Sequence, residues 1–273
     1  MSLMKLLKKA TLTVATFFAG QLLYAQQPVS CLTSEMVQES FQNEAQLQQF
    51  LGDLNDWVAQ YQNSLQQSPE NGNYIVPVVV HIIHDYGQEN ISDAQIADAL
   101  RILNEDFNRL NPDWNTVVPS FQSRVADVGF EFRLAQIDPN GDCTNGITRT
   151  SSTWTYDARD EAKSLIGWPR NRYYNIWVVH NIGDSGPGII GGYAYLPGSA
   201  PSASVDGIIL DHRYTGSIEA SNGSNFAARV ITHESGHFFG LLHPWGFSAC
   251  GSGCGDDFVA DVPTTSGACN NCV

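Results

Sequence analysis

Residues 225–246 carry the pattern that leaves the fewest options for the fold. His233 and His237 lie four positions apart, and Phe226 and Val230 precede them at helical spacing. Residues at positions i and i+4 share one face of a helix, so both imidazoles can reach a single cation. Gly240 follows where such a helix would end, because a residue without Cβ adopts the left-handed conformation that reverses a chain. The reversal brings the next histidine back toward this face.

That third histidine is His243, and together with His233 and His237 it offers three neutral nitrogens. Three nitrogen ligands suit zinc, and a fourth position left open for water is typical of a catalytic rather than a structural site. Glu234 projects beside the histidines and is the candidate general base for peptide hydrolysis. The alternative is a structural histidine cluster on a core helix, in which several polar rings would need other partners.

The N-terminus indicates the compartment. Three lysines at positions 5, 8 and 9 precede an apolar run over residues 10–19, which predicts a signal peptide at residues 1–25 and a secreted protein, extracellular or periplasmic in transit. The run is too short for a membrane anchor. With 28 acidic against 14 basic residues the net charge is -14, which argues against nucleic acid as a partner. We expect a monomer that acts on protein or peptide substrates.

The remaining chain divides into a leader and a larger domain. Residues 26–72 are rich in Gln, Asn, Ser and Glu, carry apolar residues at helical spacing, and close in a turn-rich linker, which predicts a pro-segment of one or two helices. Residues 73–273 form the predicted catalytic domain. Its apolar patterns predict strands at 75–83, 130–134 and 173–180, an edge strand at 207–210, helices from the Ser92–Gln95 capping box to 110 and at 158–166, and a glycine loop at 183–192. This mixture indicates a mixed α/β fold of the α+β class.

HESGHFFGLLHPWG followed by CGDDFVADVP resembles the pappalysin family of metzincin metallopeptidases, particularly its secreted bacterial, cytophagalysin-like branch. Similar segments include CLTSEM at residue 31, IVPVVVHIIH at 75, GITRT at 146, WPRNRYYNIWVV at 168 and GGYAYLPG at 191, so the resemblance covers about residues 31–265. It implies a zinc endopeptidase with a metzincin-like zincin domain. A twisted mixed sheet and an active-site helix would lie above the cleft, and a smaller lower subdomain would follow Gly240.

The chain departs from the family pattern in one respect. Metzincins carry a methionine turn after the third histidine, whereas this chain has methionine only at positions 1, 4 and 36. We therefore expect a C-terminally truncated sequence with a short, incomplete lower subdomain. The second reading is a non-catalytic secreted zinc-binding module or an inactive fragment. An adhesin or carbohydrate-binding domain is a third, supported only by the exported composition.

The resemblance also implies roles outside the helix. In related enzymes a leader cysteine in a similar CxT context is a cysteine switch, and Cys31 would take the open zinc position until the leader is cut. A disulfide from Cys31 to Cys143 or a later cysteine is the alternative. Related enzymes hold structural calcium near Asp256, Asp257 and Asp261, so Asp257 and Asp261 are candidate Ca²⁺ ligands, although an acidic loop explains them equally.

Other polar residues receive structural interpretations. The cysteines at 250, 254, 269 and 272 form disulfides or a structural zinc site, and export favours disulfides. The histidines at 81, 84, 180 and 212 share no chelating spacing and are expected to be structural. Residues 191–195 are expected near an edge strand that pairs with an extended substrate.

Overall fold

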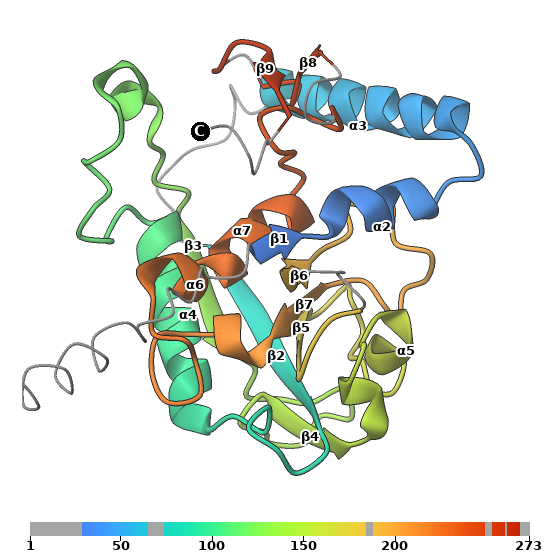
Figure 1. Ribbon diagram of the computed structural model, residues 1–273, viewed down its shortest axis with the longest axis vertical. Helices are drawn as coiled ribbons and strands as arrows, with labels where there is room; N and C mark the ends of the chain where they lie inside the picture. Colours follow the sequence, from blue (N-terminus) through green and yellow to red (C-terminus); the bar gives the residue numbers. More distant parts are fainter. Residues whose placement is uncertain (1–28, 65–73, 184–187, 249–252, 260, 268–273) are drawn as a thin grey trace, which may run out of the picture.

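The computed structural model describes residues 29–64, 74–183, 188–248, 253–259 and 261–267 (Figure 1). A seven-stranded mixed sheet forms its centre, with the strand order β1-β6-β7-β5-β2-β3 and with β4 paired to β2. The strands are β1 (Val29–Cys31), β2 (Tyr74–His84), β3 (Phe130–Leu134), β4 (Ile147–Ser151), β5 (Tyr174–Val179), β6 (Ile189–Tyr193) and β7 (Ile208–Asp211). A separate hairpin pairs β8 (Cys254–Gly255) with β9 (Thr265–Ser266).

Helices cover both faces of this sheet. The helices are α2 (Thr33–Glu39), α3 (Glu44–Ser64), α4 (Asp93–Phe107), α5 (Asp160–Lys163), α6 (Asn225–Ala228) and α7 (Val230–Phe238), with 3-10 turns at Pro119–Arg124, Thr153–Thr155 and His212–Tyr214. Figure 1 shows α4, α6 and α7 on one side of the strands and α5 on the other. The α+β expectation is confirmed. None of the helices in these ranges is both long and apolar enough to cross a membrane.

The long central strand β2 explains how two cores form. Its first half pairs with β3 and its second half with β4, while β5 lies along its other side. Because side chains alternate between faces, Val80 and Ile82 pack with α4 and α7, whereas Ile83 packs with α5. Both faces of the inner strands are therefore apolar, as is usual for parallel strands covered by helices.

Two predicted segments, the edge strand and the glycine loop, were wrong, and the helix predicted at 158–166 is limited to α5 (Asp160–Lys163). The strand predicted at 207–210 as an edge is β7, which lies between β5 and β6 and is buried along its whole length. The loop predicted at 183–192 contains most of β6, which borders β7 on one side and only the short β1 on the other. An unbroken apolar run is typical of an inner strand, so the pattern at 207–210 indicated β7's place.

The predicted helix after Ser92 starts as expected but ends earlier. Ser92 Oγ accepts the N–H of Gln95 at 3.1 Å, yet the Gln95 amide donates to the carbonyls of His212 and Thr215 instead of completing a capping box. The helix α4 ends at Phe107, before the predicted 110, because the Asn108 side chain donates to the Phe130 carbonyl at 2.8 Å and ties the chain to β3.

The described part of the predicted leader, residues 29–64, forms two helices and one short strand, which agrees with the expected helices. β1 pairs in parallel with β6, and α2 and α3 follow it directly. Val37, Leu47 and Leu51 from these helices make a small apolar core with Leu196 of the larger domain. Figure 1 shows α2 and α3 above the sheet, with α2 next to β6.

Candidate metal centre

The segment that carries the histidines folds as its sequence indicates. Ser224 Oγ accepts the N–H of Ala227 at 3.0 Å and caps α6, which passes through a break at Arg229 into α7. Gly240 has a positive φ of 98°, so the chain reverses there as predicted. After the reversal, the carbonyl of Leu241 lies 2.6 Å from His237 Nδ1.

The three histidines converge on one point. The Nε2 atoms of His233, His237 and His243 lie 3.1 to 3.2 Å from one another. Three nitrogens each about 2.0–2.1 Å from a tetrahedral zinc would lie roughly 3.3 Å apart, so this set fits zinc closely. The contact with Leu241 fixes the proton of His237 on Nδ1 and leaves its Nε2 lone pair for a metal.

Burial keeps these rings in the form that a metal requires. Burial, reinforced by the neighbouring imidazoles, lowers the pKa of His237 to about 3, and burial likewise lowers the pKa of His243 to about 4. Burial also lowers the pKa of His233. All three rings are therefore neutral near pH 7, which is the state in which imidazole binds metals.

Glu234 lies beside the cluster and is almost completely buried, with 1% of its surface exposed. Burial raises the pKa of Glu234 to about 8. Its Oε2 accepts hydrogen bonds from Thr33 Oγ1 at 3.1 Å and from Cys31 Sγ at 3.6 Å. A side chain built on Gly192 would place Cβ 2.7 Å from Glu234 Cγ, so the glycine lets α7 approach β6 closely.

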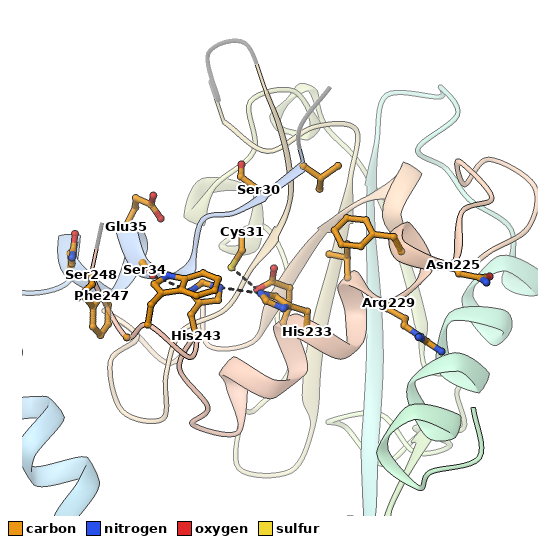
Figure 2. Close-up of a pocket in the computed structure, with 17 residues that line it drawn as sticks. Ser30, Cys31, Ser34, Glu35, Asn225, Arg229, His233, His243, Phe247 and Ser248 are labelled. Carbon is orange, nitrogen blue, oxygen red and sulfur yellow. Dashed lines mark hydrogen bonds between the residues drawn. The ribbon is translucent and has the colours of Figure 1, made fainter. Parts of the chain in front are cut away.

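Cys31 is the fourth member of the cluster. Its Sγ and the three imidazole nitrogens all lie within 4.8 Å of one another, and these residues are the group with metal-ligating geometry in the described ranges. Figure 2 shows the Cys31 side chain pointing from its strand toward His233, with His243 alongside. Burial raises the pKa of the Cys31 thiol well above its usual value in the absence of a cation. A bound zinc would favour the thiolate.

The cluster lies in a cleft with a volume of about 850 Å³. One wall comes from the leader, including Ser30, Cys31 and Glu35, and the opposite wall comes from Arg229 and Val230 at the start of α7. At one end of the view in Figure 2 lie His243, Phe247 and Ser248, and at the other lie Asn225 and Arg229. The leader therefore runs along the cleft.

The other predicted ligands are not brought together. Asp256 and Asp257 accept the N–H groups of Phe258 and Val259 in tight turns, and within the described ranges neither Asp257 nor Asp261 joins a group with metal-ligating geometry. Cys31, Cys143 and Cys254 are free thiols, so the alternative Cys31–Cys143 disulfide is wrong. The cysteines at 250, 269 and 272 lie outside the described residues.

The four histidines expected to be structural have protein partners. His81 contacts Thr148 and Asn175 at 2.7 and 3.0 Å, and burial lowers its pKa to about 4. His84 Nδ1 accepts an N–H from Tyr86, His180 contacts Glu89, and His212 contacts the carbonyl of His180. None of these four lies in the metal-ligating group of the described residues.

Sequence reasoning missed several contacts at the centre. Trp245 stacks on His243 with ring centroids 4.8 Å apart and an interplanar angle of 10°. Ser34 Oγ lies 3.5 Å from His243 Nδ1. Thr33 contacts Glu234, whereas the sequence predicted a role only for the cysteine of the CLTSEM segment. The contacts of Ser34 and Thr33 join residues 209 and 201 positions apart, and no local pattern marks them.

A buried sheet, a helix with two histidines on one face and a third histidine beyond a glycine reversal define a metzincin-like metallopeptidase domain. The family model for pregnancy-associated plasma protein-A, the Peptidase_M43 family, matches residues 140–273. Mature mirolysin from Tannerella forsythia, solved with a cleaved peptide, is 34% identical, with a TM-score of 0.63 over 73% of this chain and 74% of that one. A Tannerella forsythia promirolysin mutant is 30% identical, with a TM-score of 0.66, and the match covers 86% of this chain and 76% of that one.

Curated relatives agree with these matches. The extracellular metalloprotease of Colletotrichum graminicola is 27% identical over 208 residues, and that of Pyricularia oryzae is 28% identical over 187. The chain spans 60% and 53% of the length of these two relatives. It belongs to the pappalysin family of metallopeptidases, as the motif resemblance predicted.

Proposed function

We propose that this chain is a secreted zinc endopeptidase made as a latent zymogen, with a signal peptide at residues 1–25, a pro-segment at 26–72 and a catalytic domain at 73–273. The observation that carries the proposal is the convergence of the His233, His237 and His243 Nε2 atoms within 3.2 Å beside a buried Glu234. The relatives named extracellular metalloproteases support secretion. The greater coverage by promirolysin than by mature mirolysin supports the pro-segment.

The histidines would hold the metal and Glu234 would move the proton. When bound, zinc lowers the pKa of water and polarises the scissile carbonyl. Glu234 would accept the proton of the attacking water and pass it to the leaving amine. Strand β6 would hold the substrate, because a peptide in the place of β1 can form the same kind of backbone hydrogen bonds.

Latency would come from the leader. Cys31 Sγ lies within reach of all three imidazole nitrogens, so its thiolate would complete the zinc coordination and exclude water. We expect Cys31→Ala to shorten latency, measured as earlier self-cleavage of the purified chain. Unchanged latency of this variant would contradict the switch.

The decisive experiment measures hydrolysis of an unfolded protein after the leader is cut within residues 65–73. Glu234→Ala and a zinc chelator are the two controls, and each should abolish cleavage. Glu234→Ala should retain bound zinc, measured by metal analysis, because the carboxylate is not among the ligands. A folded, zinc-loaded chain that cleaves nothing would contradict the peptidase and favour a non-catalytic zinc-binding module.

Calcium is the second proposed metal. Asp257 and Asp261 follow the third histidine closely in sequence, and carboxylate oxygens are hard ligands that suit Ca²⁺. The ion would hold the segment that follows Trp245. Its test is a stability measurement, given in the Discussion.

A further inference from the structure

The Thr33 hydroxyl makes two buried hydrogen bonds beside the histidine cluster that involve none of the proposed metal ligands. Its Oγ1 donates to Glu234 Oε2 at 3.1 Å and accepts the N–H of Ala194 at 2.9 Å. Thr33, Glu234 and Ala194 are all at least 97% buried. A hydroxyl can donate to a carboxylate and accept from an amide at the same time, which a methyl group in its place cannot do.

We propose that the Glu234 carboxylate and the Ala194 N–H form a hydroxyl-binding subsite beside the histidines, and that Thr33 fills it as a lock independent of Cys31. The inference deepens the proposed zymogen and rests on that proposed function. The ligand class of the subsite is an alcohol, here the side chain of a threonine two residues beyond the thiol.

The backbone explains how Cys31 and Thr33, two positions apart, make different sets of contacts. Cys31 ends β1, and the Leu32 N–H donates to the carbonyl of Gly192 at 3.1 Å. Thr33 then begins α2, and its own N–H contacts Cys31 Sγ at 3.4 Å. The chain changes from strand to helix at this point, so the thiol lies among the imidazoles and also contacts Glu234 Oε2, while only the hydroxyl joins Glu234 to the Ala194 N–H.

The Cys31 contact and the Thr33 contacts differ in whether they depend on a bound metal. A thiolate on zinc holds only when the metal is present, whereas the Thr33 hydroxyl contacts a glutamate oxygen and a backbone amide that are present with or without metal. The occupied subsite also removes two groups that the reaction would use. The Thr33 hydroxyl occupies Oε2 of the proposed base, and it covers a backbone donor directly after the strand that would bind substrate.

The test measures how fast the leader leaves the rest of the molecule. A specific protease site placed within residues 66–72 of the full chain allows a single cut, and size-exclusion chromatography or native mass spectrometry then follows dissociation of the leader. The measurement is made with zinc and after zinc removal, on the wild type and on Thr33→Val, Thr33→Ser and Cys31→Ala. No step requires turnover.

We expect Thr33→Val to speed dissociation about tenfold or more in both metal states, because two buried hydrogen bonds are lost and the buried Glu234 oxygen and Ala194 N–H are left without this partner. Thr33→Ser keeps the hydroxyl and should stay near the wild type. Cys31→Ala should speed dissociation with zinc and have a much smaller effect without it. Ser40→Ala is the matched control, since Ser40 Oγ donates to the Met36 carbonyl of the same helix and does not contact the subsite.

The possible outcomes separate the subsite from the proposed enzyme. Unchanged dissociation of Thr33→Val in both metal states would overturn the inference, and so would an effect that disappears when zinc is removed. Loss of binding in Thr33→Ser equal to that in Thr33→Val would also overturn it, because the hydroxyl would then not be the cause. A released leader with no hydrolysis would contradict the peptidase and leave the subsite supported.

Discussion

Lys163 has an ionisable amine in the protein interior, where a positive charge is unfavourable. It is fully buried behind β6, and its Nζ donates to the carbonyls of Val205 and Gly207 at 3.1 Å. The rings of Tyr193 and Tyr195 lie 4.2 and 4.9 Å from Nζ. Burial, only partly offset by nearby carboxylates, lowers the pKa of Lys163 to about 7. The amine links Tyr193 of β6 to the loop that precedes β7, and it makes no direct ion pair with a carboxylate of the described residues.

This shifted pKa predicts a pH-dependent effect of Lys163→Met. Above about pH 7 the folded protein holds a neutral amine, while the unfolded chain keeps its proton up to roughly pH 10.4. Unfolding therefore takes up a proton in this window, and the wild type gains stability as the pH rises. We expect the free energy of unfolding of the wild type, relative to Lys163→Met, to rise by about 1 kcal/mol per pH unit.

Urea denaturation of both proteins at pH 7, 8 and 9 measures this slope. Loss of the two hydrogen bonds from Nζ adds a cost to Lys163→Met that is the same at every pH, so only the slope tests the shifted pKa. A stability difference that stays constant between pH 7 and 9 would contradict it.

At the scale of strands and helices, local sequence patterns predict some elements of the fold and miss others. The histidine helix, its glycine reversal and strands β2, β3 and β5 follow from local periodicity, because each has one clear pattern of burial. The strand at 207–210, β7, was wrongly predicted at the edge of the sheet, because the order of strands depends on long-range contacts that no local pattern records. β4 was matched only as the segment GITRT, without a strand assignment, and three of its five residues are Thr or Ser. Contacts such as Thr33 with Glu234 depend on the same long-range folding.

The junction of α7 with β6 gives an element-level prediction for Gly192→Ala. The added Cβ would lie 2.7 Å from Glu234 Cγ and 2.9 Å from the Ile209 carbonyl, which is closer than side chains tolerate. The helix would have to move away from the strand, and overpacking of this kind costs about 1–3 kcal/mol. We expect a lower denaturation midpoint and weaker zinc binding, since His233 and His237 lie on that helix.

Gly236→Ala is the matched control for this substitution. It lies on the same helix, and its added Cβ would meet only Leu241 Cδ1, at an ordinary 3.7 Å. Replacing a helical glycine by alanine without a clash is expected to stabilise the protein by about 0.4–1 kcal/mol. Equal losses of stability in the two variants would show that the close approach at Gly192 is not the cause.

At the scale of the whole molecule, an apolar contact that involves none of the histidines or Cys31 also holds the leader segment in place. Leu51 of α3 is buried with Leu196, next to Leu242 and Phe247. Leu51→Ala should cost about 2–5 kcal/mol, because a buried leucine leaves a cavity when it is truncated. The cost falls on docking of the leader, so we expect faster leader dissociation from the cut protein and an unchanged hydrolytic rate of the separated catalytic domain.

Val58→Ala on the same helix provides the comparison for Leu51→Ala. Val58 is 37% exposed and lies outside that apolar cluster, so its truncation should change the dissociation rate little. If both variants released the leader equally fast, general loss of helix stability would explain the effect better than docking at Leu196.

The segment that carries Asp256 and Asp257 contacts Gly246, three residues after the third histidine, His243. Gly246 has a positive φ of 56°, and a Cβ there would lie 2.4 Å from the Asp256 carbonyl oxygen. The backbone at Gly246 and the backbone at Asp256 are therefore in close contact. Gly246 follows Trp245, which stacks on His243. A cation held by Asp257 and Asp261 would therefore stabilise the support of a metal ligand as well as its own loop.

Calcium removal tests this connection through the thermal stability of the full chain. A ligand present at 100 times its Kd stabilises the folded state by about 2.7 kcal/mol, which corresponds to a shift of roughly 5–10 °C for a domain of this size. We expect EGTA with zinc kept saturating to lower Tm by several degrees, and calcium to restore it. Asp257→Asn combined with Asp261→Asn should have a low Tm that no longer responds to calcium. A Tm of the wild type that EGTA does not change would leave the two aspartates as acidic loop residues without a metal.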